Sequence, residues 1–201
     1  MFEVDSPGSQ LQKRAAVARL FPSAVAGKGD PAGEAGLRFV AQDFEHEPID
    51  SLPDALRREG LDNKKPTFVL LEGARVLRRN AYSTNLTNLE GVVEYLTPEA
   101  VDATVRVARK LGGARSRLVV EYVQPSTFRV SWLHRATVFA WFRTAGESFR
   151  FMGWEAGALD GYLAARGWKL LSNESTLEAA ARLNARPVKR VVTHIGVAEA
   201  V

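Results

Sequence analysis

The sequence of 201 residues suits one domain of ordinary size, and its 46% hydrophobic and 25% charged residues are typical of a folded globular chain. The absence of cysteine excludes disulfides, thiolate metal sites and cysteine nucleophiles. The 27 basic and 23 acidic residues give a formal net charge of +4, and the basic residues are scattered among acids. Because this pattern favours a solvated surface, we expect no nucleic-acid partner.

A membrane partner is not expected either. No apolar run approaches the roughly 18 residues that a membrane-spanning helix needs. Residues 1–12 lack the basic segment followed by an apolar one that marks a secretory signal. We therefore expect a cytoplasmic protein.

Short apolar segments alternate with helical patterns along the chain, which is typical of βαβ units around a parallel sheet. In chain order the patterns predict strand 2–5, helix 7–21, strand 37–41, helix 52–58, strand 67–71, helix 98–111, strand 118–123, helix 156–166, strand 168–171, helix 176–183 and strand 188–195. The fold class that follows is α/β.

Burial can be predicted for three of these elements. Two helices carry apolar stripes, formed by Leu11, Ala15, Ala18 and Phe21 in the first and by Val101, Val105, Ala108 and Leu111 in the third. Strand 67–71 is apolar without alternation, which indicates a central strand buried on both faces. The aromatic residues between 128 and 142 are interpreted as core or as the lining of a substrate pocket.

Familiar catalytic motifs are missing from the sequence. The three histidines lie far apart without metal-ligand spacing, and there is no GxSxG nucleophile elbow. The Gly27-x-Gly29-x-x-Ala32 match to the dinucleotide fingerprint follows a predicted helix, where that fingerprint needs a strand. We therefore predict no metal site, and the sequence assigns no catalytic residue.

Acidic residues follow three of the predicted strands, at Asp5, Asp43 and Glu72. In open α/β sheets the ligand lies beyond the carboxyl ends of the strands, where a carboxylate can accept hydrogen bonds from two ribose hydroxyls. Each acid alone could instead be a helix cap or a turn residue. The recurrence on three strands favours a nucleoside-containing cofactor, with the local role as the alternative.

Four segments, 2–7, 39–45, 66–73 and 94–104, resemble the leucine carboxyl methyltransferase-like family. They read FEVDSP, FVAQDFE, PTFVLLEG and EYLTPEAVDAT, and they occur in the order of the family pattern. The resemblance implies a class I enzyme that uses S-adenosylmethionine and has a Rossmann-like three-layer sandwich.

The resemblance also implies roles for individual residues. Asp5 is expected to hold the ribose hydroxyls of the cofactor, and Asp43 and Phe44 are expected beside the adenine. The strand-end glutamate of the family, near the amino acid part of the cofactor, corresponds to Glu72 or Glu90. Tyr95 is expected close to the region of methyl transfer.

The sequence departs from the family pattern in two places. The first strand of the family and its glycine-rich loop have no counterpart, because Met1 and Phe2 already fall within the second strand. We therefore interpret residues 1–201 as a single, N-terminally truncated and incomplete methyltransferase domain. The motif Leu-Glu-Gly at 71–73 recurs at 89–91, so residues 74–91 are interpreted as an insertion, either a surface loop or unspliced sequence.

Three functions remain open from the sequence. The leading hypothesis is transfer of a methyl group from S-adenosylmethionine to an oxygen or nitrogen of a small molecule or a carboxylate. The alternatives are a non-catalytic remnant of such an enzyme, and a nucleotide-sugar or nicotinamide enzyme that shares the ribose-binding acid.

Overall fold

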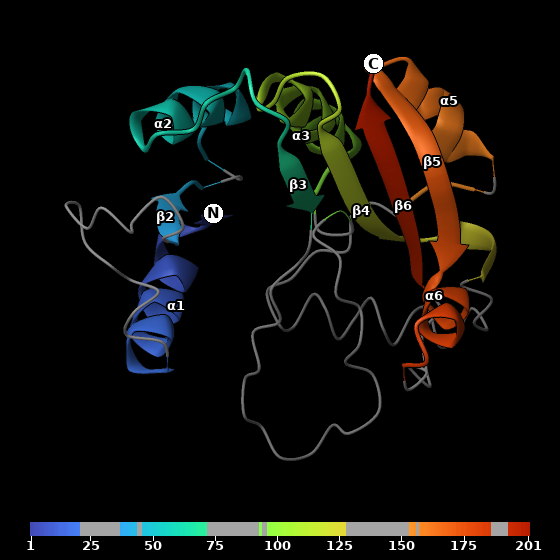
Figure 1. Cartoon of the computed structure of the whole chain (residues 1–201), viewed down its shortest axis with the longest axis horizontal. Coiled ribbons are helices and arrows are strands. Elements are labelled where there is room, and N and C mark those ends of the chain that lie inside the picture. Colours follow the sequence, from blue (N-terminus) through green and yellow to red (C-terminus); the bar gives the residue numbers. More distant parts are fainter. Residues whose placement is uncertain are drawn as a thin grey trace. The chain divides into compact units, whose positions relative to one another are not determined.

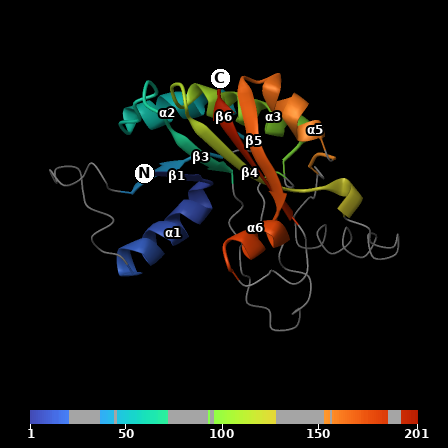
Figure 2. The same cartoon turned by 45° about the vertical axis from the view of Figure 1, so that its right-hand side comes forward.

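The computed structural model describes residues 1–20, 37–43, 46–71, 93, 96–127, 153–155, 157–185 and 193–201. The chain divides into two compact units, Met1–Asn63 and Lys64–Val201, and both are visible in Figures 1 and 2. The single domain over residues 1–201 stays a prediction. The interpreted insertion at 74–91 lies outside the described residues.

The first unit is built on two parallel strands, β1 (Phe2–Asp5) and β2 (Arg38–Ala41). Phe2 is in register with Arg38, and Asp5 with Ala41. The N–H of Gln42 donates to the carbonyl of Asp5 at 2.9 Å, which extends the pairing beyond β2. Both strands therefore end at the same edge of this small sheet.

Helices α1 (Pro7–Leu20) and α2 (Leu52–Arg58) complete the first unit, with the short 3₁₀ helix η3 (Ile49–Ser51) before α2. Leu52 and Leu56 of α2 are buried, and Gly60 follows the helix with a φ of 95°, which favours glycine at a helix end. The helices predicted at 7–21 and 52–58 are thus confirmed with bounds that differ by one residue at most.

The predicted apolar stripe of α1 is wrong. Leu11 is 73% exposed, whereas Gln10 is buried. The Gln10 side-chain amide donates to the carbonyls of Glu3 at 3.1 Å and Val40 at 3.2 Å. Since this one side chain satisfies a carbonyl on each strand, a polar residue orients the helix and the leucine faces solvent.

The second unit contains a four-stranded sheet in the order β3 (Phe68–Leu71), β4 (Arg117–Val123), β6 (Thr193–Ala200) and β5 (Trp168–Ser175). Strands β3 and β4 are parallel, while β6 is antiparallel to both β4 and β5. The fully parallel sheet expected from the sequence is therefore wrong for this unit. Consecutive strands β5 and β6 are direct neighbours in this sheet, and α6 (Thr176–Arg182) lies in the connection between them.

Two strands extend beyond their predicted ends. Strand β5 continues to Ser175 instead of ending at 171, because its polar second half pairs with β6. Strand β6 runs to Ala200 instead of ending at 195. Alternating or polar segments carry a weak sequence signal, so backbone pairing sets these bounds.

Strand β3 is not the central strand that its apolar sequence predicts. It pairs only with β4 among the described strands, and Phe68 and Leu70 are 66% and 50% exposed. Val69 and Leu71 pack against the core. The two interior positions belong to β4, which lies between β3 and β6, and to β6, which lies between β4 and β5.

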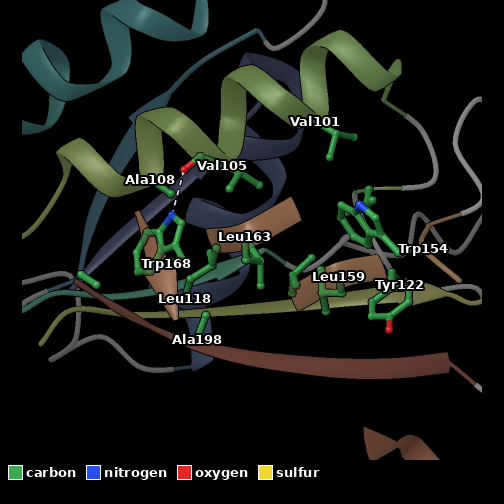
Figure 3. Packing of buried hydrophobic residues seen from close by; sticks show 13 residues of the cluster. Val101, Val105, Ala108, Leu118, Tyr122, Trp154, Leu159, Leu163, Trp168 and Ala198 are labelled. Carbon is green, nitrogen blue, oxygen red and sulfur yellow. Dashed lines mark hydrogen bonds between the residues drawn. The ribbon is translucent and has the colours of Figure 1, made fainter. Parts of the chain in front are cut away.

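The core of the second unit lies between this sheet and two helices, α3 (Pro98–Lys110) and α5 (Ala158–Ala164) (Figure 3). Thr97 caps α3 by accepting the Ala100 N–H at 3.2 Å, a role for which threonine is favoured. The predicted stripe of α3 is confirmed, because all four of its members are buried: Val101, Val105, Ala108 and Leu111. The remaining elements are the 3₁₀ helix η5 (Pro125–Thr127) and α6 (Thr176–Arg182), which begins with a capping box formed by Ser175 and Glu178.

Trp168 joins the sheet to α3. Its side chain is fully buried, and its indole N–H donates to the Val105 carbonyl at 3.3 Å (Figure 3). Trp168 therefore contributes both apolar area and the one hydrogen bond that its ring can make.

Replacing Trp168 with alanine is expected to lower the free energy of unfolding by about 3 to 5 kcal/mol, because a large cavity remains in the core. Lys169→Ala is the matched control, since Lys169 is the exposed next residue of β5 and its loss is expected to change stability by less than about 0.5 kcal/mol. Urea unfolding followed by circular dichroism measures both. Equal stability of the two variants would contradict the central place of Trp168.

Candidate functional site

The structure brings two of the predicted residues, Asp5 and Asp43, to one edge of the first unit. Asp5 is the last residue of β1, and Asp43 lies two residues beyond Ala41, the partner of Asp5 in β2. The hydrogen bond from the Gln42 N–H to the Asp5 carbonyl fixes the segment between them. Two carboxylates thus follow adjacent parallel strands, which is the placement that a ligand site in an α/β sheet requires.

The Asp5 carboxylate is held by one donor on each oxygen. Its Oδ1 accepts the backbone N–H of Ser6 at 2.7 Å, and its Oδ2 lies 2.6 Å from Nζ of Lys13. Its side chain is 22% exposed, so the carboxylate remains open to solvent on one side. The Ser6 bond shows that Asp5 also has the local role at the helix start that was the alternative reading of its sequence.

Lys13 bridges Asp5 and a second carboxylate of β1. Its Nζ lies 2.5 Å from Oε1 of Glu3. Burial favours a lower pKa for Lys13, but the hydrogen bonds and negative charges of Asp5 and Glu3 outweigh it, and the pKa is raised. Lys13 is therefore an ammonium at neutral pH, at the edge where β1 ends.

Asp43 takes part in a turn. Its Oδ1 accepts the backbone N–H of His46 at 3.3 Å, and its Oδ2 lies 2.9 Å from Nδ1 of the same residue. The Asp43 side chain is 33% exposed. Like Asp5, it combines a local turn contact with a carboxylate that solvent reaches.

Sequence reasoning missed Gln42 and Lys13. Gln42 directly precedes Asp43 in the chain, its side chain is buried, and its Nε2 has no hydrogen-bond partner in the described part of the chain. A polar residue directly after an apolar strand was the signal that could have identified it. Lys13 carried no such signal, because its contact with Asp5 depends on the direction in which α1 leaves the sheet.

The other four predicted residues, Phe44, Glu72, Glu90 and Tyr95, lie outside the described residues. The same holds for the aromatic segment 128–142. Their places at the site stay predictions.

The carboxyl end of β4 carries an aromatic cluster in the second unit. Trp154 lies edge-on against Tyr122 with ring centroids 5.2 Å apart, and His194 of β6 lies 5.7 Å from Tyr122. The Tyr122 hydroxyl donates to Oδ1 of Asn173 at 3.0 Å. The buried Nε2 of His194 has no hydrogen-bond partner among the residues described here. Burial lowers the pKa of His194, and the nearby Glu178 only partly opposes this.

Comparison with known proteins supports the resemblance seen in the sequence. A family model described as leucine carboxyl methyltransferase matches residues 1–86. The resemblance to the leucine carboxyl methyltransferase family is confirmed over these residues. The matched segment contains Asp5 and Asp43, as well as Phe44 and Glu72. A search of curated protein sequences finds no match.

Several solved structures share the fold of this chain at low sequence identity. A candidate methyltransferase from Thermobifida fusca YX is 15% identical, with a TM-score of 0.55, and the match covers 99% of this chain and 62% of that one. Magnesium protoporphyrin IX methyltransferase from Synechocystis PCC 6803, solved with bound SAH, is 11% identical with a TM-score of 0.50, and the match covers 100% and 64%. A candidate O-methyltransferase from Nostoc punctiforme PCC 73102 is 10% identical with a TM-score of 0.50, and the match covers 98% and 44%.

These likenesses establish the fold. The chain shares the Rossmann-like α/β fold of these methyltransferases, as the family resemblance implies. It spans less than two thirds of the length of each of these three structures.

Two further features bear on possible ligands. Within the described ranges, no group of three or more His, Asp or Glu side chains is arranged to hold a metal ion. No helix in the described part of the chain combines the length and the apolar character needed to cross a bilayer.

His194 is expected to make stability depend on pH. Since the pKa of His194 is lower in the folded protein than in the unfolded chain, the unfolded state binds a proton that the folded state does not as pH falls below about 6.5. The contribution of neutral His194 to the free energy of unfolding is therefore complete above that pH. It is lost as pH falls toward the pKa of His194 in the folded protein. Urea unfolding at pH 7.5 and pH 5 should therefore show a smaller acid loss in His194→Gln than in the wild type. An equal loss in both proteins would contradict the buried neutral imidazole.

Proposed function

We propose that this protein is an S-adenosylmethionine-dependent methyltransferase that transfers a methyl group to an oxygen or nitrogen of a small molecule or a carboxylate. The observation that carries the proposal is the pair of carboxylates, Asp5 and Asp43, that follow adjacent parallel strands inside the segment matched by the family model. The Synechocystis methyltransferase of the same fold was solved with bound SAH, which supports the choice of cofactor.

The Asp5 carboxylate has the acceptor capacity that a ribose needs. A carboxylate oxygen offers about two acceptor positions, and the Ser6 N–H and the Lys13 ammonium occupy one on each oxygen. One position per oxygen is left, which matches the two hydroxyls of a vicinal diol. Asp5 therefore fits its proposed role without losing either of its internal partners.

Asp43 is proposed to accept the exocyclic amine of the adenine, with Phe44 in apolar contact with the ring. Glu72 or Glu90 is proposed near the amino acid part of the cofactor, and Tyr95 near the methyl group. The bound cofactor supplies an activated methyl group, and the task of the protein is to hold the acceptor atom in line with it while excluding water. Little further chemistry is required from the side chains.

We further propose that residues 1–201 form one methyltransferase domain with an insertion at 74–91. The scattered charge and the absence of long apolar runs support a cytoplasmic protein whose acceptor is neither a nucleic acid nor a membrane lipid. The family match and the shared fold support methyl transfer over the alternative of a non-catalytic remnant.

Calorimetric titration of the full chain with S-adenosylhomocysteine is expected to show saturable binding at micromolar concentration. Asp5→Asn should weaken binding by about 1 to 3 kcal/mol, because it removes a charged hydrogen-bond acceptor. Asp54→Asn is the matched control, because Asp54 is an exposed carboxylate of α2 paired with Arg57 in the same unit. The affinity of this variant for S-adenosylhomocysteine should equal that of the wild type.

The alternatives predict different titrations. If titration of the folded wild-type chain with S-adenosylhomocysteine releases no heat, the result would favour a non-catalytic remnant of a methyltransferase. Competition by NAD would favour a nicotinamide enzyme. Equal affinity of Asp5→Asn and the wild type would remove Asp5 from the site.

A further inference from the structure

Lys13 contacts both carboxylates of β1. It lies on α1, eight residues after Asp5, and its Nζ reaches Oδ2 of Asp5 at 2.6 Å and Oε1 of Glu3 at 2.5 Å. We infer that Lys13 is a positioning residue that holds the Asp5 carboxylate in the orientation that accepts the ribose diol. This inference rests on the proposed function, because it assigns to Lys13 a part in that same site.

The Asp5 carboxylate is restrained at both of its oxygens. A carboxylate can turn about two side-chain bonds, and the Ser6 N–H on Oδ1 restrains only one of its ends. Lys13 holds the other oxygen, so the two contacts together fix the plane of the group. A fixed plane lowers the ordering cost of binding a diol at the two remaining acceptor positions.

Lys13 also places a positive charge beside two neighbouring carboxylates of β1. Glu3 and Asp5 are two residues apart in β1, so their side chains leave the strand on the same face. Two carboxylates on one face repel each other, and without a cation Asp5 would turn toward solvent. The ammonium of Lys13, which contacts both carboxylates, offsets this repulsion.

The expected change in ligand affinity depends on how far the three charged side chains are exposed to solvent. The side chains of Lys13, Glu3 and Asp5 are 35%, 23% and 22% exposed, so solvent screens their charges in part. We therefore expect a change of several-fold in affinity. The opposite effect follows if the ammonium competes with the ribose for Asp5, in which case removal of Lys13 tightens binding.

The test is a double-mutant cycle measured by calorimetry with S-adenosylhomocysteine on the full chain. Lys13→Met is expected to weaken binding about three- to tenfold, and Lys13→Arg to stay within about threefold of the wild type, because it keeps a cation near Asp5. In the Asp5→Asn background, Lys13→Met is expected to change affinity less than about twofold, because its effect acts through the missing carboxylate. Glu3→Gln, which keeps the pair of Lys13 and Asp5, is the control expected to stay within about twofold.

The outcomes separate the inference from the proposed function. No binding by the wild type overturns both. Binding that weakens in Asp5→Asn but is unchanged or tighter in Lys13→Met overturns the inference alone. An equal loss from Lys13→Met with and without Asp5 indicates a purely structural role and also overturns it. Lys13→Gln, which keeps a neutral donor of similar length, repeats the test if Lys13→Met does not fold, and its expected loss has the same direction.

Discussion

The parallel pairing of β1 with β2 is the constraint on which the candidate site depends. Its register places Asp5 opposite Ala41, and one further bond from the Gln42 N–H carries the pairing past the end of β2. A shift of one residue would send one of the two acids to the other face of the sheet. The backbone ladder therefore decides whether two carboxylates form a site, and their side-chain contacts refine it.

Both carboxylates also serve the local fold. Asp5 accepts the N–H of Ser6, the residue before α1, and Asp43 accepts an N–H in the turn after β2. These bonds use only part of the acceptor capacity of each group. A strand-end acid can thus stabilise a helix start and still meet a ligand, so its structural role is no argument against a functional one.

The sequence was most informative where structure is set locally. The start of α3 at Pro98 and its buried stripe depend on residues within a few turns of each other, and both were predicted correctly. Predictions from the sequence were wrong where contacts between residues far apart in the chain set the structure. Gln10 rather than Leu11 faces the strands because strand carbonyls satisfy its amide, and β3 lies at an edge of its sheet despite its apolar residues.

In the candidate site, too, the positions set by local structure could be predicted and those set by distant contacts could not. Asp5 and Asp43 could be predicted because strand ends are visible in the sequence, and both fall in the segment that the family model matches. Lys13 could not be predicted, since its contacts depend on how α1 packs against β1. Low identity to structures of the same fold is consistent with this, because a fold keeps its strand ends in place while the residues around them change.

The position of β6 has a consequence for biosynthesis. It is the last of the strands described in the chain, yet it lies between β4 and β5 and bonds to both. During translation, β4 and β5 leave the ribosome with no partner between them until residues 193–200 emerge. The nascent second unit therefore passes through a stage with unpaired strand edges, and such edges are prone to aggregation.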